Sequence, residues 1–585
     1  MPGTPRDDET ASAGPGGAVH RRVLVLGTDE RAFLSVVRSL GRRGIEVHTG
    51  WCAPGAPALR SRYIARNHEI RPYSPESRLW EDDLLAAVRS APFDLVIPCT
   101  DETEIPLRRA REELGRHARL CLLSDRAHGI VSDKSKTSEL ARSLGVPVPD
   151  ESPVGSIEEA AEAARTHGFP LVLKPISSFD PFDPSSKNRV RIAFDRGELE
   201  RLAESMLLRG RVLAQRYCPG RGTGIEILAR SGTILFAFRH ERIHEPLRGG
   251  GSSYRRSVPL DGGMLDAARR IAAALDYTGV AMFEFRHDRT SGEWRLLEIN
   301  GRFWGSLPLA LAAGADFPWY LYQMLVEGRR EFGQGYRTGI CCRNLASDIH
   351  WNIVNLSRDR SDPRMNTLPL GSVLAEARHL LLLRERSDTF VIDDPLPGFA
   401  QIASLAGSVM KKLRGRIGRA AAPGAGGRPA GLREILARSR KIHFVCKGNI
   451  CRSPYAERYA RSVLPPDIEV GSSGYLAPAG RRPPPEAVEA ARESGIDLSA
   501  HRSSLIDAGT VGDREIVFVF DDSNRREIER RFPEARSRTF MIGLLADPPV
   551  REVPDPYGGD LGEFRRTYAL IRRAVDGMAL HTRRE

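Results

Sequence analysis

A strand, a loop and the start of a helix follow one another at residues 442–454, and no other part of the chain constrains the fold as strongly. The apolar run Ile442–Cys446 (IHFVC) predicts a buried strand. The expected helix has Ser453 as its N-cap and Pro454 at its first position. Backbone N–H groups at a helix N-terminus bind anions. The sequence therefore predicts an α/β unit with an anion site at the turn between strand and helix.

This turn holds a cysteine and an arginine in the spacing Cys446-x5-Arg452. A ring of N–H groups and a guanidinium lower the pKa of a cysteine placed among them. Arginine also binds phosphate oxygens in a bidentate manner. A thiolate can then attack phosphorus, and water hydrolyses the cysteinyl-phosphate. The leaving oxygen needs a proton, and the candidate acid is Asp555, between two prolines in VPDPY at 553–557.

Residues 441–585 resemble the low-molecular-weight protein tyrosine phosphatases. The matching stretches are VCKGNICRSPYAE at 445–457, SSG at 472–474, GIDLSAHRS at 495–503, FDDSN at 520–524 and VPDPYGG at 553–559. The resemblance implies that Cys446 is the nucleophile, Arg452 the phosphate clamp and Asp555 the acid. It also implies that three residues support the loop, namely Asn449, Ser453 and Cys451, the last as a reversible disulfide partner of Cys446. A phosphotyrosine protein is the implied substrate, and no cofactor is implied for this domain.

Two further loop features bear on the substrate. Lys447 occupies a position that is often apolar in that family, so it either favours acidic substrates or is merely solvated. No cysteine follows Cys451 in the sequence. This argues against arsenate reduction, which in thiol-coupled relatives on the same fold needs further cysteines downstream.

Lysine is rare in this chain, because only eight of the 87 basic residues are lysines. Four of the eight lie between residues 134 and 187. A lysine differs from an arginine in being a compact point charge on a flexible stem. The 134–187 window is therefore the part of the chain to examine for a site that requires lysine instead of arginine.

Acidic and amide side chains gather on two expected strands downstream of that window. In LLEIN, Glu298 and Asn300 are two residues apart and face the same side of a strand. A turn at Asp288–Gly292 would bring Glu284 beside them. Two carboxylates and an amide oxygen suit Mg²⁺ (or Mn²⁺). These three residues are therefore a candidate divalent-metal site.

Residues 126–330 resemble ATP-grasp domains of the carbamoyl-phosphate-synthase-like, carboxylate–amine ligase type. The resemblance implies that Lys134, Lys174 and Gln215 bind ATP and that Arg302 stabilises the transition state. A carboxylate is implied to become an acyl phosphate, which an amine or thiol then attacks. The expected covering loop at 177–187 departs from the usual glycine-rich composition and holds two aspartates and two prolines: Asp180, Pro181, Asp183 and Pro184.

The remaining organisation follows from composition and periodicity. Residues 1–20 are expected to be a disordered lead-in without a secretory signal. Strands alternating with helices at 21–125 predict a Rossmann-like domain before the ATP-grasp domain, and the absence of GxGxxG argues against dinucleotide binding. Residues 331–413 are expected to form a helical tail, 414–434 a Gly/Ala/Pro/Arg-rich linker and 435–585 the phosphatase domain with a central parallel sheet. The predicted fold class is accordingly a multidomain combination of α/β and α+β units.

The bulk composition excludes some functions and leaves three hypotheses. The formal charge of +12 is spread along the chain and interleaved with acids, so nucleic-acid binding is not expected. No apolar run is long enough to span a membrane, and eight scattered cysteines favour the reducing cytoplasm. The first hypothesis is a bifunctional ligase and phosphatase. The alternatives are a phosphatase with a nucleotide-sensing module, and a scaffold with two inert sites.

Overall fold

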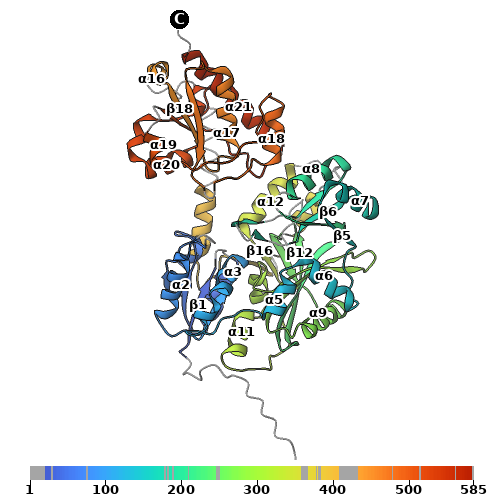
Figure 1. The fold of residues 1–585 in the computed structure, drawn as a ribbon. Coiled ribbons are helices and arrows are strands. Elements are labelled where there is room, and N and C mark those ends of the chain that lie inside the picture. Colours follow the sequence, from blue (N-terminus) through green and yellow to red (C-terminus); the bar gives the residue numbers. More distant parts are fainter. Residues whose placement is uncertain are drawn as a thin grey trace, which may run out of the picture. The chain divides into compact units, whose positions relative to one another are not determined.

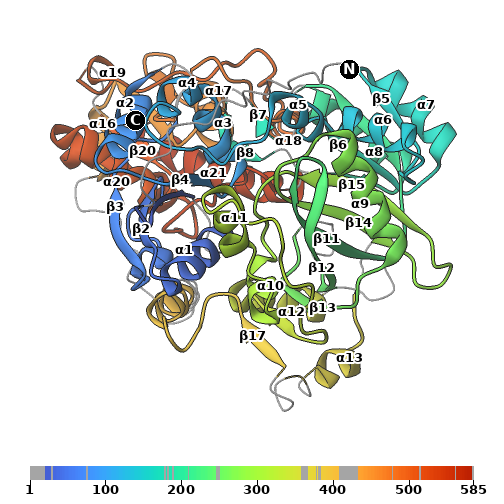
Figure 2. The ribbon, with the colours of Figure 1, turned by 90° about the horizontal axis from the view of Figure 1, so that it is seen from below.

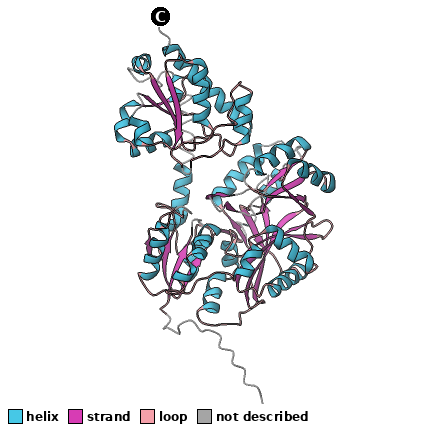
Figure 3. Cartoon of the chain, viewed as in Figure 1, coloured by secondary structure: helices cyan, strands magenta, loops and turns pink. Residues whose placement is uncertain are grey.

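The structure is a computed structural model. It describes residues 20–27, 31–73, 77–176, 179–180, 183–187, 190–207, 210–245, 251–357, 367–376, 379, 384–407, 432–476, 479–512, 516–559 and 561–582. The chain divides into two compact units, Met1–Val409 (unit 1) and Met410–Glu585 (unit 2). Their ribbons are shown in Figures 1 and 3. Within the described residues, no helix is long and apolar enough to cross a membrane.

Unit 1 begins with a parallel four-stranded sheet in the order β3-β2-β1-β4. Its strands are β1 (Arg22–Leu26), β2 (Glu46–Gly50), β3 (Ile64–His68) and β4 (Leu95–Pro98). The helices around it are α1 (Ala32–Arg42), α2 (Leu79–Arg89), α3 (Asp101–Arg109) and the short α4 (Arg111–Leu114). Alternation of parallel strands and helices confirms the predicted α/β class for this part.

A small antiparallel sheet follows, in the order β5-β10-β6-β9. Its strands are β5 (Glu151–Val154), β6 (Leu171–Pro175), β9 (Arg191–Ala193) and β10 (Val212–Arg216). Helices α7 (Ile157–His167) and α8 (Arg196–Leu207) pack on it. The expected covering loop instead pairs its backbone in a hairpin of β7 (Phe179–Asp180) and β8 (Asp183–Lys187). The side chains of residues 177–189 lie outside the described residues.

The largest sheet of unit 1 has seven strands in the order β15-β14-β11-β12-β13-β16-β17 (Figure 2). The strands are β11 (Arg221–Arg230), β12 (Thr233–His244), β13 (Tyr254–Ser257), β14 (Gly279–His287), β15 (Trp294–Asn300), β16 (Cys341–Arg343) and β17 (Glu385–Ser387). One face packs on α5 (Asp125–Val131), α6 (Lys134–Ser143) and α9 (Gly262–Ala274). The other packs on α10 (Leu307–Ala313), α11 (Phe317–Leu325) and α1. The face of the sheet that packs on α1 also carries Glu284 of β14 and Glu298 of β15, which belong to the second site described below.

The segment expected to be a helical tail at 331–413 contains strands as well as helices. Helices α12 (Leu345–Ser357) and α13 (Leu370–Ala375) are present. However, β16 pairs antiparallel with β13, and β17 pairs parallel with β16, so both extend the large sheet. Sequence patterning missed them because each has only three residues, too few to show a strand period.

Unit 2 is built on a parallel sheet in the order β19-β18-β20-β21. The strands are β18 (Lys441–Cys446), β19 (Glu469–Gly474), β20 (Ile516–Val519) and β21 (Thr539–Met541). Helices α16 (Leu432–Arg438), α17 (Arg452–Val463), α18 (Pro485–Arg492) and α21 (Leu561–Thr582) share one core, whereas α19 (Ala508–Gly512) and α20 (Asp522–Arg531) pack on the other face. Leu432 of α16 is fully buried in this core, so the packed unit starts before the predicted boundary at 435. The predicted central parallel sheet is confirmed.

Candidate active sites

The first site lies in unit 2, where β18 ends and α17 begins. The helix begins at Arg452, with Cys451 as its N-cap residue. Ser453 is therefore not the N-cap that the sequence predicted, because its hydroxyl lies 3.1 Å from the Cys446 Sγ instead. The N–H of Asn449 donates to the same sulfur at 3.2 Å. The buried sulfur thus lies among donors that stabilise a thiolate.

Asn449 holds the loop in shape. Its backbone adopts a left-handed conformation with φ of 51°. Its amide nitrogen donates to the hydroxyls of Ser453 and Ser472, both at 2.9 Å, and its amide oxygen accepts from the N–H of Ser504 at 2.8 Å. The ring of His501 contacts its carbonyl at 2.9 Å. These bonds compensate for a backbone conformation that non-glycine residues rarely adopt.

Arg452 brings the candidate acid next to the loop. Its side chain is 1% exposed, and its Nη2 lies 2.8 Å from the Oδ2 of Asp555, which is 41% exposed. Its Nη1 donates to Asp521 at 2.6 Å and to the carbonyl of Val553 at 3.0 Å. Although burial lowers the pKa of Arg452, Asp555, Cys446 and Asp521 together raise it above the usual range. The buried Nε has no hydrogen-bond partner among the described residues, which suits an arginine awaiting an oxyanion.

Asp521 is a site residue that the sequence reasoning missed. It follows β20 and caps α20 by accepting from the N–H of Asn524 at 2.7 Å. Burial raises the pKa of Asp521, but the opposing effect of Arg452 and of hydrogen bonds is larger. The pKa of Asp521 is therefore lower than its usual value. One signal was available, since carboxyl ends of neighbouring parallel strands meet at one sheet edge, and β18 and β20 are neighbours.

Cys451 follows Cys446 in the same loop, and both residues are buried, at 3% exposure for each. Both are free thiols in the structure. Burial raises the pKa of the Cys451 thiol well above its ordinary value, and the nearby Asp555 adds to the shift. Cys451 is therefore a poor nucleophile at neutral pH, and its disulfide with Cys446 stays a prediction.

Gly474 limits the space behind the loop, and its replacement is a first test of the geometry. A Cβ there would lie 2.8 Å from the Asn449 nitrogen and 2.9 Å from the Gly448 carbonyl carbon. We expect Gly474→Ala to displace the loop, to destabilise unit 2 by about 1–3 kcal/mol and to lower phosphatase kcat by about tenfold or more. Gly512→Ala, where a Cβ meets nothing within 4 Å, is the matched control. Equal kcat for the two variants would contradict the expectation.

The second site lies in unit 1, where the predicted metal ligands come together. Glu284 of β14 and Glu298 of β15 are direct cross-strand partners, and Met282 pairs with Asn300. The amide of Asn300 lies 3.4 Å from the Oε1 of Glu298. Within the described residues no three His, Cys, Asp or Glu side chains form a metal cluster. A divalent ion would therefore need the Asn300 oxygen and nucleotide phosphates beside the two carboxylates, a donor set that suits Mg²⁺.

Both predicted lysines lie close to these carboxylates. Burial raises the pKa of Glu298, but Lys134 and Lys174 lower it, and their effect prevails. Burial also lowers the pKa of Lys174, with Lys134 contributing and Glu298 opposing. Lys134 opens α6 and its Nζ donates to the Pro175 carbonyl at 3.4 Å. Two buried lysines beside two partly exposed carboxylates fit a site for metal-bound phosphates.

Gln215 lies on the small sheet beside Lys174. On β10 it pairs with Val172 of β6, two residues before Lys174, so both polar side chains face the same side. Its amide donates to Glu151 at 2.9 Å. Its place near the lysines agrees with the predicted nucleotide contact.

Arg302 is not brought to the carboxylates in this structure. Its Nη2 donates to Asp101 of α3 at 2.7 Å and its Nη1 to the Phe303 carbonyl at 2.9 Å. A different arginine, Arg242 of β12, donates to Glu284 at 2.6 Å. Although burial lowers the pKa of Arg242, Glu284 and Glu245 raise it above the usual range. The sequence analysis did not assign Arg242, because its partner Glu284 is 42 residues away and lies on another strand.

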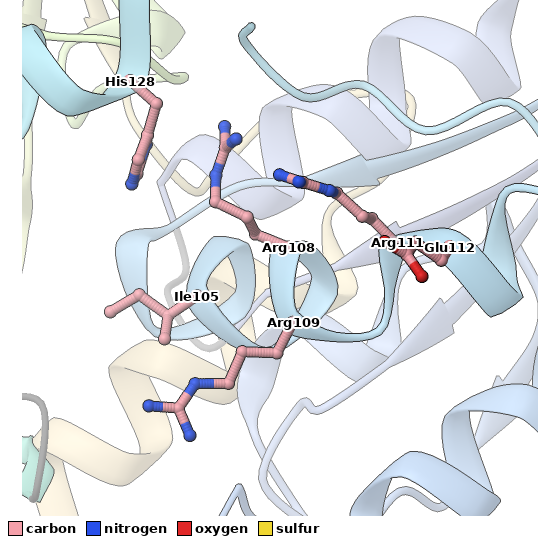
Figure 4. Close-up of a pocket in the computed structure, with 6 residues that line it drawn as sticks. All are labelled: Ile105, Arg108, Arg109, Arg111, Glu112 and His128. Carbon is pink, nitrogen blue, oxygen red and sulfur yellow. The ribbon is translucent and has the colours of Figure 1, made fainter. Parts of the chain in front are cut away.

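A pocket of about 350 Å³ elsewhere in unit 1 is rich in arginine. Figure 4 shows its lining residues: Ile105, Arg108, Arg109, Arg111, Glu112 and His128. Arg108 and Arg111 both donate to Asp125, and Arg108 also pairs with Glu104. These arginines are already balanced by the chain's own acids, so the lysine–carboxylate cluster is the stronger candidate for ATP.

Family models match both halves of this description. Residues 441–585 match the model for low molecular weight phosphotyrosine protein phosphatase. Residues 209–344 match the model described as ATP-grasp in the biosynthetic pathway with Ter operon. The two predicted resemblances are thereby confirmed.

Curated relatives match the C-terminal quarter of the chain. A probable low molecular weight protein-tyrosine-phosphatase, EpsP of Ralstonia solanacearum, is 34% identical over 137 residues, covering 23% of this chain and 92% of the relative. A protein-arginine-phosphatase of Geobacillus stearothermophilus is 31% identical over 139 residues, covering 24% and 93%. Among solved structures, a biotin carboxylase–ATP complex from Campylobacter jejuni has a TM-score of 0.45 and 19% identity, covering 55% of this chain and 74% of the other.

Proposed function

Because this chain belongs, through residues 441–585, to the low molecular weight protein-tyrosine-phosphatase family, we propose that unit 2 hydrolyses protein phosphotyrosine through a cysteinyl-phosphate. We propose also that unit 1 is a Mg·ATP-dependent ligase that joins a carboxylate to an amine or thiol. The chain is then a bifunctional enzyme. The predicted domain boundaries within unit 1, after residues 125 and 330, are also part of this proposal.

The phosphatase proposal rests on one observation, the set of donors around Cys446. The Asn449 N–H and the Ser453 hydroxyl contact the sulfur, and Arg452 is buried beside it. A phosphate bound by Arg452 and the loop N–H groups presents its phosphorus to the thiolate. The sulfur forms the S–P bond while the P–O bond to tyrosine breaks.

Asp555 supports both halves of that reaction. It is held at the loop by Arg452 and is partly exposed, so it meets both substrate and solvent. In the first step its carboxyl gives a proton to the leaving phenolate oxygen. In the second step the same carboxylate takes a proton from the water that attacks the cysteinyl-phosphate.

The ligase proposal rests on the meeting of Lys134 and Lys174 with Glu284, Glu298 and Asn300. When bound there, Mg·ATP supplies the phosphoryl group that turns a carboxylate into an acyl phosphate. Glu284, Glu298 and the Asn300 oxygen would hold the ion, and the two lysines would hold the phosphates. Gln215 would orient the nucleotide from the neighbouring sheet, and Arg302 would leave Asp101 to stabilise developing charge.

Substrate assays on the full chain test both proposals. We expect a phosphotyrosine peptide to be hydrolysed, and a phosphoarginine peptide to be a poor substrate. The reverse preference would favour protein-arginine-phosphatase activity for unit 2, the activity named for the Geobacillus stearothermophilus relative. For unit 1, we expect ADP release from Mg·ATP with some member of a carboxylate and amine pool. Tight ATP binding without ADP release in any pool would favour the nucleotide-sensing alternative.

A further inference from the structure

Two glycines on β11, Gly222 and Gly224, leave room for neighbouring side chains on one face of the large sheet. Gly224 is flanked by His240 of β12 on one side and by Glu284 of β14 on the other. A Cβ at Gly224 would lie 2.6 Å from the Cε1 of His240 and 2.7 Å from the Oε1 of Glu226. A Cβ at Gly222 would lie 2.7 Å from the Cδ of Arg242. Side chains of β12 therefore lean over β11 toward the metal carboxylates, which only glycine permits.

Glu226 and His240 form a buried pair on this same face. Their exposures are 0% and 1%, and the Glu226 Oε1 lies 2.5 Å from the His240 Nδ1. The second carboxylate oxygen, Oε2, is buried and has no hydrogen-bond partner in the described part of the chain. No hydrogen bond from the His240 Nε2 to a described residue is present either. Buried polar atoms are nearly always paired, so the Glu226 Oε2 points to a ligand.

The pair lies at a suitable distance from the metal site. His240 and Glu284 are separated by one intervening strand, which corresponds to about 10 Å between their backbones. Phe238 and Met282, which pair with Glu226 on either side, give the region an apolar wall. A substrate bound at Glu284 and reaching His240 would cross the intervening strand at Gly224.

We propose that His240 is the base that deprotonates the amine acceptor of the ligase, and that Glu226 is its positioning residue. This inference rests on the ligase function proposed above. An amine bound as its ammonium form gives one proton to the His240 Nε2. The freed lone pair forms the C–N bond to the acyl carbon, while the C–O bond to phosphate breaks. Phosphate leaves with the electron pair of that bond and with the second nitrogen proton.

The surroundings fit such a transfer. Glu226 fixes the tautomer through Nδ1 and balances the imidazolium that forms, as a carboxylate does in other histidine bases. The other groups that face the pair are Arg242 on β12, Glu284 on β14, Arg255 on β13 and Tyr336, whose hydroxyl donates to the Val258 carbonyl. Arg242 and Arg255 are paired with Glu284 and Asp388, so they do not compete for Glu226.

The test compares two acceptors in the full-length chain. Mg·ATP is the nucleotide, and a mixture of the twenty amino acids supplies both the carboxylate and the amine. Hydroxylamine replaces the amines in a parallel assay, because it is already uncharged at neutral pH and needs no base. We expect Glu226→Gln and His240→Gln to lower amide formation at pH 7 about 100-fold or more, with hydroxamate formation retained. The loss should shrink about tenfold per pH unit as the free amine becomes more abundant.

Controls separate the outcomes. Glu241→Gln alters a carboxylate next to His240 but on the opposite face of β12, and should match wild type in both assays. Thermal shift with Mg·ATP checks that each variant is folded. If wild type forms hydroxamate and both variants form amide at the wild-type rate, His240 is not the base, while the ligase proposal stands. If wild type forms neither product, the ligase proposal falls and this assignment with it.

Discussion

Replacing Cys446 with serine should abolish hydrolysis of aryl phosphates by the full chain, lowering kcat about 10⁴-fold or more. The sulfur lies at the centre of the donor set of Asn449 and Ser453, with Arg452 beside it, and no other group near phosphorus is a comparable nucleophile in the described loop. A serine hydroxyl at the same place stays protonated and attacks slowly. Steady-state hydrolysis of p-nitrophenyl phosphate measures the effect, and ³²P labelling of wild type shows the intermediate.

Cys451→Ser is the matched control for that experiment. Cys451 is as buried as Cys446, and its raised thiol pKa makes it unfit as a nucleophile, so the variant should retain most of its activity. If Cys446→Ser kept measurable turnover while Cys451→Ser lost it, the two roles would be exchanged. The comparison thus tests the assignment of the nucleophile independently of damage to the loop.

The difference in how well the sequence predicted the two sites has a structural cause. The phosphatase loop lies within Cys446–Ser453, so strand, turn, arginine and helix are all local, and the Cys446-x5-Arg452 spacing fixes their relation. Residues that act from elsewhere were harder to find. Asp521 contacts Arg452 across 69 residues, and Arg242 contacts Glu284 across 42. Such pairs are set by strand order, which no local pattern encodes.

Strands that depend on a neighbour were likewise missed. The sequence of β3, IARNH, is mostly polar and exposed because it is the edge of its sheet, so it lacks the apolar run that predicts a buried strand. In contrast, β18 and β20 are central and fully apolar on at least one face, and both regions were predicted to be α/β. Periodicity therefore predicted the buried centre of each sheet better than its margins.

Glu298→Ala should lower the rate of ADP release by unit 1 about 100-fold or more. The phosphatase activity of unit 2 should be unchanged. Two effects act in the same direction. The variant removes one of two carboxylates that would hold the divalent ion. It also removes a negative charge that opposes the lowering effect of burial on the pKa of Lys174. Mg²⁺-dependent nucleotide binding should therefore weaken together with turnover.

Glu293→Ala, at a side chain 69% exposed just before β15, is the control and should behave as wild type. Unaltered Mg·ATP binding in Glu298→Ala would show that the metal lies elsewhere. Intact phosphatase activity of the same preparation would show that unit 2 is folded and that the loss is confined to unit 1.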